Sequence, residues 1–227
     1  MPSEPKDPVP GLPHEVQAIR AEIRKFYRST DASGRTVASV KHGVYAFFDY
    51  DNEPIYAGQT VESLSTRINR HLTNQRTDAV AMNVLDPFEV AFIEVWPMDD
   101  LVQGLSQDAL SALMNKAEFT VYSKVLKDSK LGAILNEKTV FTTDLIELPP
   151  SIKGCIIPAD IFPLRKHPDI RLARRAATIA NLARVISERD VSDGLRVTLL
   201  TQARRLELLA TERLRELGIG QAHDQKT

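Results

Sequence analysis

The stretch GVYAFFDYDNEPIYAGQTVESLSTRINRH, residues 43–71, decides the fold of this chain. Two apolar runs, over 37–50 and 55–58, flank the turn-forming residues 51–54, and this arrangement predicts an antiparallel hairpin. Apolar side chains alternate along the first run. One face of that strand is therefore expected to be buried while Tyr45 points to the other face.

An amphipathic helix is predicted directly after the hairpin, with Thr60 as its N-cap. Its buried stripe is expected to consist of Leu64, Ile68 and Leu72. Arg67 and His71 lie four residues apart at the margin of that stripe, so both side chains leave the helix on one side. An arginine in such a place most often forms a salt bridge. Two tyrosines, an arginine and a histidine delivered by one hairpin and one helix nevertheless look more like a reaction site than a packing arrangement.

The same periodicity predicts further elements along the chain. Helices are expected over 14–28, 106–127, 170–189 and 195–217. A strand is expected over 88–96, and another strand or an extended edge over 140–148. In the last two helices the expected apolar stripes are Leu172, Ala176, Ile179, Ala183 and Ile186, and Leu199, Ala203, Leu206, Ala210 and Leu214. These stripes predict a helical hairpin with arginines on its other faces. The predicted fold class is α+β: a small, mostly antiparallel mixed sheet flanked by helices and followed by a C-terminal α-helical hairpin.

The chain of 227 residues is long enough for one sizeable domain with an accessory piece. The proline-rich residues 1–13 are expected to be disordered. The other expected parts are a domain over 14–150 with an insertion around 74–105, a basic helical region over 151–218 and a tail over 219–227.

The charge is distributed unevenly although the formal net charge is only -1. Residues 165–217 contain 12 Lys and Arg against 7 Asp and Glu, a balance of +5. This basic segment in the C-terminal third of the chain is consistent with nucleic-acid binding and equally with the solvated faces of a helical hairpin. On the first interpretation, the arginines expected to bind DNA are Arg174, Arg175, Arg204 and Arg205.

Several classes of protein are excluded or disfavoured by composition. The single cysteine, Cys155, cannot form an internal disulfide and suits a reducing cytosol, so a cytoplasmic location is expected. No apolar run is long enough to span a membrane, and the N-terminal residues do not resemble a secretory signal. A zinc site is disfavoured because His71 has no second histidine at ligand spacing. Glycine-rich phosphate loops and the motifs of serine hydrolases and kinases are absent.

Hydrolysis of a phosphodiester requires an activated water, neutralisation of charge on the phosphoryl oxygens and assistance to the leaving alkoxide. A carboxylate that borders the apolar stripe of the helix over 106–127, Glu118, is a suitable oxygen ligand for a divalent metal ion, although such carboxylates usually pair with Lys or Arg. A tyrosine is a weak base at its ordinary pKa and needs a metal ion or a histidine to share the proton. The residues that together supply these parts are Tyr45, Tyr56, Arg67, His71 and Glu118.

This set of residues, in this order, resembles the GIY-YIG nuclease superfamily. The two tripeptide motifs appear as GVY at 43–45 and YAG at 56–58, separated by ten residues. The positions that match the superfamily's later residues are Arg67, His71, Glu118 and Asn136. The resemblance covers about residues 40–140. Ala57 stands where the second motif usually has isoleucine. The segment before Asn136 lacks the usual proline and aromatic residue, and its distance from Glu118 is longer than is usual in small members.

The resemblance implies a small mixed sheet with helices and a single Mg²⁺ or Mn²⁺ bound through Glu118. It further implies that Tyr45 is the general base assisted by His71, that Arg67 stabilises the phosphate, and that Tyr56 orients the phosphate or the water. Asn136 completes the implied catalytic set.

The function predicted from the sequence is a divalent-metal-dependent DNA endonuclease, of the bacterial restriction or phage-defence kind. A structure-specific DNA repair or recombination nuclease is the alternative within the same chemistry. A non-catalytic nucleic-acid-binding or adaptor protein on the same fold is the alternative from another class. The expected partner is DNA, and a homodimer formed through the C-terminal helices would let two sites cut both strands.

Overall fold

A four-stranded sheet forms the centre of the computed structural model, which describes residues 11–72, 85–136 and 140–219. The strands are β1 (Gly43–Phe48), β2 (Pro54–Thr60), β3 (Phe92–Pro97) and β4 (Ile152–Cys155). They are hydrogen-bonded in the order β2-β1-β3-β4, and each neighbouring pair is antiparallel. Strand β2 is therefore an edge strand. The antiparallel hairpin predicted from residues 37–50 and 55–58 is confirmed, although its first strand begins later than expected, at Gly43.

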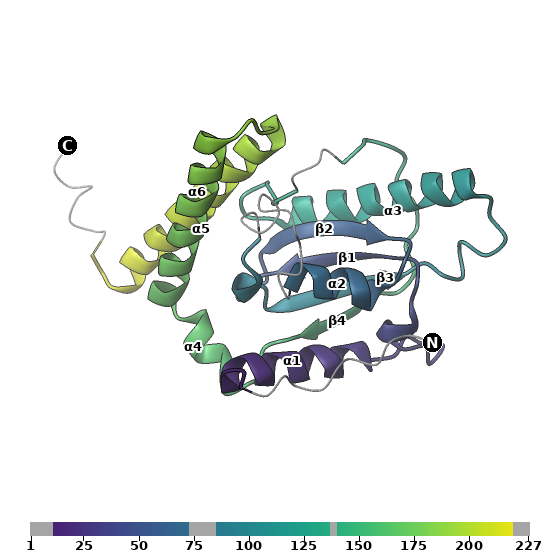
Figure 1. The fold of residues 1–227 in the computed structure, drawn as a ribbon, viewed down its shortest axis with the longest axis horizontal. Helices are drawn as coiled ribbons and strands as arrows, with labels where there is room; N and C mark the ends of the chain where they lie inside the picture. Colours follow the sequence, from purple (N-terminus) through teal and green to yellow (C-terminus); the bar gives the residue numbers. More distant parts are fainter. Residues whose placement is uncertain (1–10, 73–84, 137–139, 220–227) are drawn as a thin grey trace.

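Helices cover both faces of this sheet, as Figure 1 shows. The covering helices are α1 (His14–Tyr27), α2 (Leu64–Leu72) and α3 (Gln107–Asp128). Val44, Ala46 and Phe48 belong to the core that contains α3, whereas Tyr45 and Phe47 belong to the core that contains α1 and α2. The prediction of one buried face was thus too simple: every residue of β1 is buried because each face has its own helical cover.

The structure around α2 differs from the prediction in two respects. His71, expected at the margin of the buried stripe, is itself buried, whereas Leu72 is only half-buried. The start of the helix also differs. Thr60 is still the last residue of β2, so it cannot be the N-cap of the helix. Ser63 precedes the first helical residue, and its carbonyl accepts the Arg67 amide at 2.9 Å. The shift comes from the sheet, since β2 pairs with β1 as far as Thr60.

The C-terminal helices form the predicted antiparallel hairpin beside one end of the sheet (Figure 1). Their bounds, with the short helix that precedes them, are α4 (Phe162–Lys166), α5 (Pro168–Glu188) and α6 (Asp193–Glu216). The strand expected over 140–148 is absent, and the fourth strand is instead Ile152–Cys155. Because that strand pairs with β3, the sheet extends beyond the boundary expected at residue 150.

The hairpin does not bury the stripes that its periodicity predicted. The buried residues of α5 are Arg171, Arg175, Leu182 and Val185, and those of α6 are Leu195, Thr198, Thr201, Gln202, Arg205 and Leu209. None of the ten predicted stripe residues is among them; those of α5 and α6 are half-buried or exposed. The two helices are thus rotated about their axes relative to the prediction. Three buried arginines explain the rotation, because their side chains point toward acidic groups of the sheet domain.

Those acidic groups lie after β1 and before β3. A single oxygen of Asp49, Oδ2, accepts hydrogen bonds from Arg171 at 3.0 Å, Arg175 at 2.9 Å and Arg205 at 2.8 Å. Glu89, in a short 3₁₀ helix (Pro87–Glu89), accepts from Arg175 Nε at 3.1 Å. The hairpin is thus attached to the sheet domain through a buried ion cluster.

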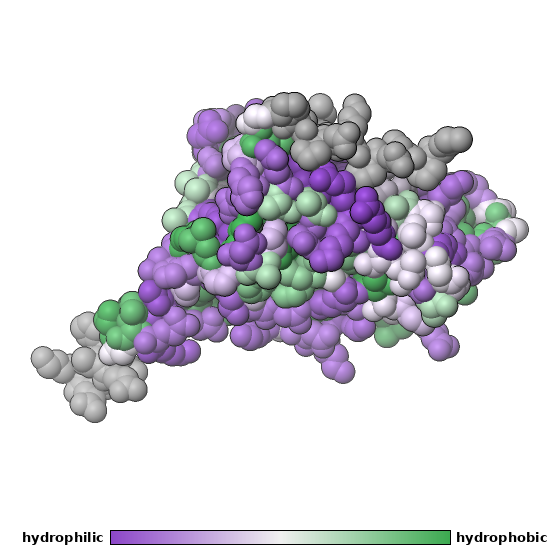
Figure 2. All heavy atoms as spheres, turned by 90° about the horizontal axis from the view of Figure 1, so that it is seen from below, coloured by the Kyte–Doolittle hydropathy of each residue, from purple (hydrophilic) through white to green (hydrophobic). Residues whose placement is uncertain are grey.

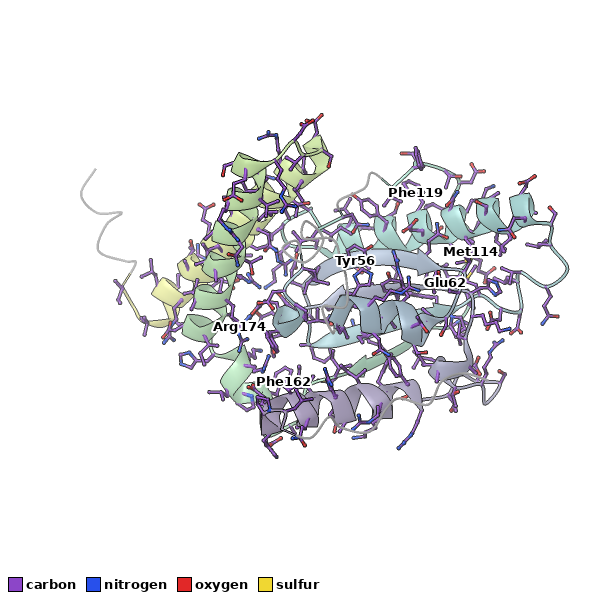
Figure 3. All side chains as sticks on the ribbon, in the orientation of Figure 1. Tyr56, Glu62, Met114, Phe119, Phe162 and Arg174 are labelled. Atoms are coloured by element: carbon purple, nitrogen blue, oxygen red, sulfur yellow. The ribbon has the colours of Figure 1, made fainter. Side chains whose placement is uncertain are left out.

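The ion cluster corrects part of the expectation for DNA binding. Arg175 and Arg205 are buried and paired with Asp49, so they are not available on the surface. Arg174 lies on α5 near α4 (Figure 3), with its side chain mostly buried and 3.8 Å from Glu89. Arg204, the last of the four, is exposed.

Within the described parts of the chain, the helices are all too short or too polar to cross a lipid bilayer. Residues 1–10 of the N-terminal segment, residues 74–84 of the expected insertion and residues 220–227 of the tail lie outside the described residues.

Candidate active site

The hydroxyl of Tyr45 is the centre of the site that the structure assembles. Its side chain is fully buried on β1, on the face covered by α2. The hydroxyl oxygen lies 2.9 Å from Nε2 of His71 and accepts a hydrogen bond from Nε of Arg67 at 3.3 Å. One phenol is therefore held between an imidazole and a guanidinium, both presented by the same side of α2, as the four-residue spacing predicted.

Burial strongly influences the protonation of this phenol. Removal from water raises the pKa of Tyr45 well above its ordinary value, and the nearby Tyr56 adds to the rise, while the charge and hydrogen bond of Arg67 oppose it. Tyr45 is consequently a neutral phenol in the resting site. When Nε2 of His71 is unprotonated, the phenol can donate its proton to that nitrogen.

Tyr56 reaches the same place from the edge strand and lies between β2 and α2 (Figure 3). Its ring centroid is 5.0 Å from that of His71 and 6.1 Å from that of Tyr45. Arg67 interacts electrostatically with both phenols. The three rings and the guanidinium form one wall of the site.

Gly58 permits this close arrangement. It pairs with Tyr45 across the hairpin, and a Cβ atom at this position would lie 2.8 Å from the Tyr45 hydroxyl oxygen and 2.8 Å from Cε1 of Tyr56. Such separations are well inside van der Waals contact. The glycine of the second tripeptide is thus required by the proximity of two aromatic rings.

Glu118 approaches the site from the opposite face of the sheet. It lies on α3 beside the buried residues Ala117 and Val121, and its Oε2 accepts a hydrogen bond from Nε2 of Gln59 at 3.1 Å. Burial raises the pKa of Glu118, whereas the hydrogen bond from Gln59 and the positive charge of Arg67 oppose that rise. The charge of Arg67 thus acts on Glu118 across the edge strand β2.

Asn136 has a role that differs from the other residues. Its side-chain Nδ2 donates to the carbonyl of Ala57 at 2.8 Å, and its Oδ1 accepts from the Ala57 amide at 3.3 Å. The amide side chain thus pairs with the free edge of β2 as a neighbouring strand would. It fixes the backbone between Tyr56 and Gly58.

The donor set around Glu118 fits Mg²⁺ or Mn²⁺ better than zinc. In the described ranges no three His, Cys, Asp or Glu side chains are grouped to hold a metal ion. A single half-buried carboxylate at an open sheet edge suits Mg²⁺ and Mn²⁺, which accept oxygen donors and retain several waters. Glu118 is the residue that would hold the ion.

The structure therefore brings together most of the residues that the sequence singled out. Tyr45, Tyr56, Arg67 and His71 form one cluster, with Glu118 on its far side and Asn136 supporting the backbone of β2. Sequence reasoning missed Gln59 and Asn115, which contact Glu118 or each other. The alternation along β2 could have placed Gln59 on the α3 face, since it follows Gly58 directly.

The model of the GIY-YIG catalytic domain matches residues 41–106 of the chain. The matched segment contains Tyr45, Tyr56, Arg67 and His71 and ends before Glu118. The match supports the resemblance of this segment to the GIY-YIG superfamily and indicates a nuclease-type domain. No curated protein and no solved structure matches the chain.

Proposed function

We propose that this protein is a divalent-metal-dependent DNA endonuclease of the bacterial restriction or phage-defence kind. The observation that carries the proposal is the Tyr45 hydroxyl held between Nε2 of His71 and Nε of Arg67. A purely structural core would gain little from placing a phenol, an imidazole and a guanidinium in contact on the buried face of a sheet. The nuclease-type domain indicated for residues 41–106 provides independent support.

In the proposed reaction, Tyr45 takes a proton from the attacking water while its own proton passes to Nε2 of His71, 2.9 Å away. This transfer through a neutral phenol avoids a free tyrosinate, which the buried site disfavours. Arg67 is positioned to neutralise the phosphoryl oxygens, and Tyr56 to orient the phosphate or the water.

Glu118 would hold the Mg²⁺ or Mn²⁺ ion on the other side of the scissile phosphate. When bound, such an ion neutralises phosphoryl charge and assists departure of the leaving alkoxide. Asn136 would contribute indirectly, because it fixes the strand that carries Tyr56.

The exposed side of the hairpin is the proposed surface for DNA and for a second copy of the chain. Arg204 remains available there, whereas Arg175 and Arg205 do not. Exposed apolar residues gather where α6 ends, at Leu214, Leu217 and Ile219, and Figure 2 shows hydrophobic atoms at this end of the molecule. A homodimer through this end would cut both strands, whereas a monomer favours nicking or branched DNA and the structure-specific alternative.

The proposed activity is tested with supercoiled, single-stranded and branched DNA incubated with Mg²⁺. Wild type is expected to cut at least one of these substrates, and Arg67→Ala and Tyr45→Phe are expected to reduce the rate by about a hundredfold or more. Absence of cutting by folded wild type on all three substrates would favour the non-catalytic binding protein. The mass of wild type measured by analytical ultracentrifugation distinguishes a homodimer from a monomer.

A further inference from the structure

Gln59 occupies a special position next to the proposed metal ligand. It follows the second tripeptide on β2 and, by strand alternation, projects to the face covered by α3 rather than to the face of the tyrosines. Its Nε2 donates to Oε2 of Glu118 at 3.1 Å, and its main-chain amide also favours the charged carboxylate. The free edge of β2 is thus joined to α3 beside Glu118.

Asn115 fixes the orientation of this glutamine. Its Oδ1 accepts the second hydrogen of the same Gln59 amide at 2.8 Å. Asn115 and Glu118 are three residues apart on α3, so they lie on one side of the helix. Two acceptors one helical turn apart therefore determine the direction in which the Gln59 amide points, and they use both of its donor hydrogens.

A glutamate side chain on a helix has three rotatable bonds, and only part of this one is buried. Among the described residues, Gln59 donates a side-chain hydrogen bond to the carboxylate of Glu118. Arg67 attracts the carboxylate by charge from the opposite face but is itself hydrogen-bonded to Tyr45. Gln59 is therefore the group that restricts the carboxylate directionally.

We infer that Gln59 is a positioning residue, held by Asn115, which orients the carboxylate of Glu118 to receive a divalent metal ion. The inference deepens the proposed function and rests on it. Partners that orient metal ligands from outside the coordination sphere typically contribute 10- to 100-fold to metal affinity. The effect of the Gln59 side chain belongs near the low end of this range, because its main-chain amide remains in any variant.

The experiment measures Mn²⁺ binding without DNA, by electron paramagnetic resonance titration of free Mn²⁺, and separately measures plasmid cleavage. Gln59→Leu is expected to weaken Mn²⁺ binding by about tenfold and to reduce cleavage mainly at low metal concentration, with partial recovery at high concentration. Gln107→Leu, the same substitution on an exposed first-turn position of α3, is the matched control and is expected to bind Mn²⁺ as wild type does.

The outcomes separate this inference from the proposed function. If wild type binds Mn²⁺ and Glu118→Ala does not, the metal role of Glu118 stands; equal binding by wild type and Gln59→Leu then overturns the positioning role alone. If wild type and Glu118→Ala bind Mn²⁺ equally, Glu118 is not the metal ligand, and both the metal dependence of the proposed function and the positioning role of Gln59 are overturned. Should Gln59→Leu not fold, Asn115→Ala removes only the restraint on Gln59 from an exposed position. A several-fold loss of Mn²⁺ affinity in that variant supports the inference, and unchanged affinity overturns it.

Discussion

At the scale of single residues, Gly58 connects the geometry of the strand to that of the site. A methyl group at this position would meet Tyr45 and Tyr56, and the Tyr45 hydroxyl cannot move freely because His71 and Arg67 both hold it. We predict that Gly58→Ala lowers the free energy of unfolding by about 1–3 kcal/mol and reduces DNA cleavage much more strongly than it reduces folding. Urea denaturation and plasmid cleavage measure the two effects, and wild-type cleavage by the variant would contradict the proposed closeness of the rings.

Asp51 provides a prediction about pH. Burial raises the pKa of Asp51, but its hydrogen bonds and ion pairs with Arg171 and Lys166 outweigh this effect and hold the pKa below the ordinary value. A carboxylate with a depressed pKa in the folded protein stabilises it above the unfolded pKa, near 4, and that contribution is lost as the pH falls through the folded pKa. Stability should therefore fall less steeply below pH 4 in Asp51→Asn than in wild type.

Chemical unfolding at several pH values between 2 and 5 checks this expectation. The other ionisable groups, including Glu89, are present in both proteins, so the difference between the two slopes reports Asp51. Identical slopes would show that the contact between Asp51 and Arg171 does not persist in solution.

At the scale of elements, a buried ion cluster attaches the α5–α6 hairpin to the sheet domain alongside apolar residues such as Leu182, Val185 and Leu195. Removal of one member of a buried ion pair leaves the others uncompensated, which typically costs about 3–5 kcal/mol. Arg205→Ala deprives Asp49 of one donor and also removes the hydrogen bond to the Pro54 carbonyl at 2.8 Å. We predict a loss of this size in the free energy of unfolding for Arg205→Ala.

The neighbouring Arg204 supplies the matched control, because it is exposed on the same helix. Arg204→Ala should change the free energy of unfolding by less than about 0.5 kcal/mol. It should instead weaken DNA binding and reduce the salt dependence of that binding by about one unit of slope. Equal destabilisation by the two substitutions would contradict the buried cluster.

The regular elements near the first motif were predictable because their signals are local. The turn at 51–54, the alternation in β1 and the four-residue spacing of Arg67 and His71 each depend on neighbours along the chain. The contact between Gln59 and Glu118 joins residues 59 positions apart, and no local pattern encodes it. Glu118 could be singled out as a candidate ligand from its place beside the apolar stripe of its helix and from the family resemblance. Its partner Gln59 could not, because their contact is not encoded locally.

The buried face of the hairpin was mispredicted for a related physical reason. Apolar periodicity assigns the inward face to leucine, isoleucine and alanine. Arginines lie inward here because they form hydrogen bonds with Asp49 and Glu89, which are more than eighty residues earlier in the chain. A buried arginine is favourable only when its partners are also present. A helix read by itself cannot show those partners.

At the scale of the whole molecule, the ion cluster makes the hairpin part of the folded unit. A chain truncated after Lys166 would leave Asp49 and Glu89 buried or newly exposed without Arg171, Arg175 and Arg205. We predict that this truncated chain is insoluble or lacks a cooperative thermal transition, as measured by circular dichroism. A soluble product with a sharp transition would show instead that the hairpin is a separable module.

We propose that the site around Tyr45 and Glu118 cleaves DNA with the help of a divalent metal ion. The most direct measurement compares the rate at which wild type and Glu118→Gln nick a supercoiled plasmid in Mg²⁺, since this substitution preserves shape and removes the charge that would hold the ion. We predict Mg²⁺-dependent nicking by wild type and a loss of at least a hundredfold in the folded variant. Nicking by Glu118→Gln at the wild-type rate would show that Glu118 does not hold the ion.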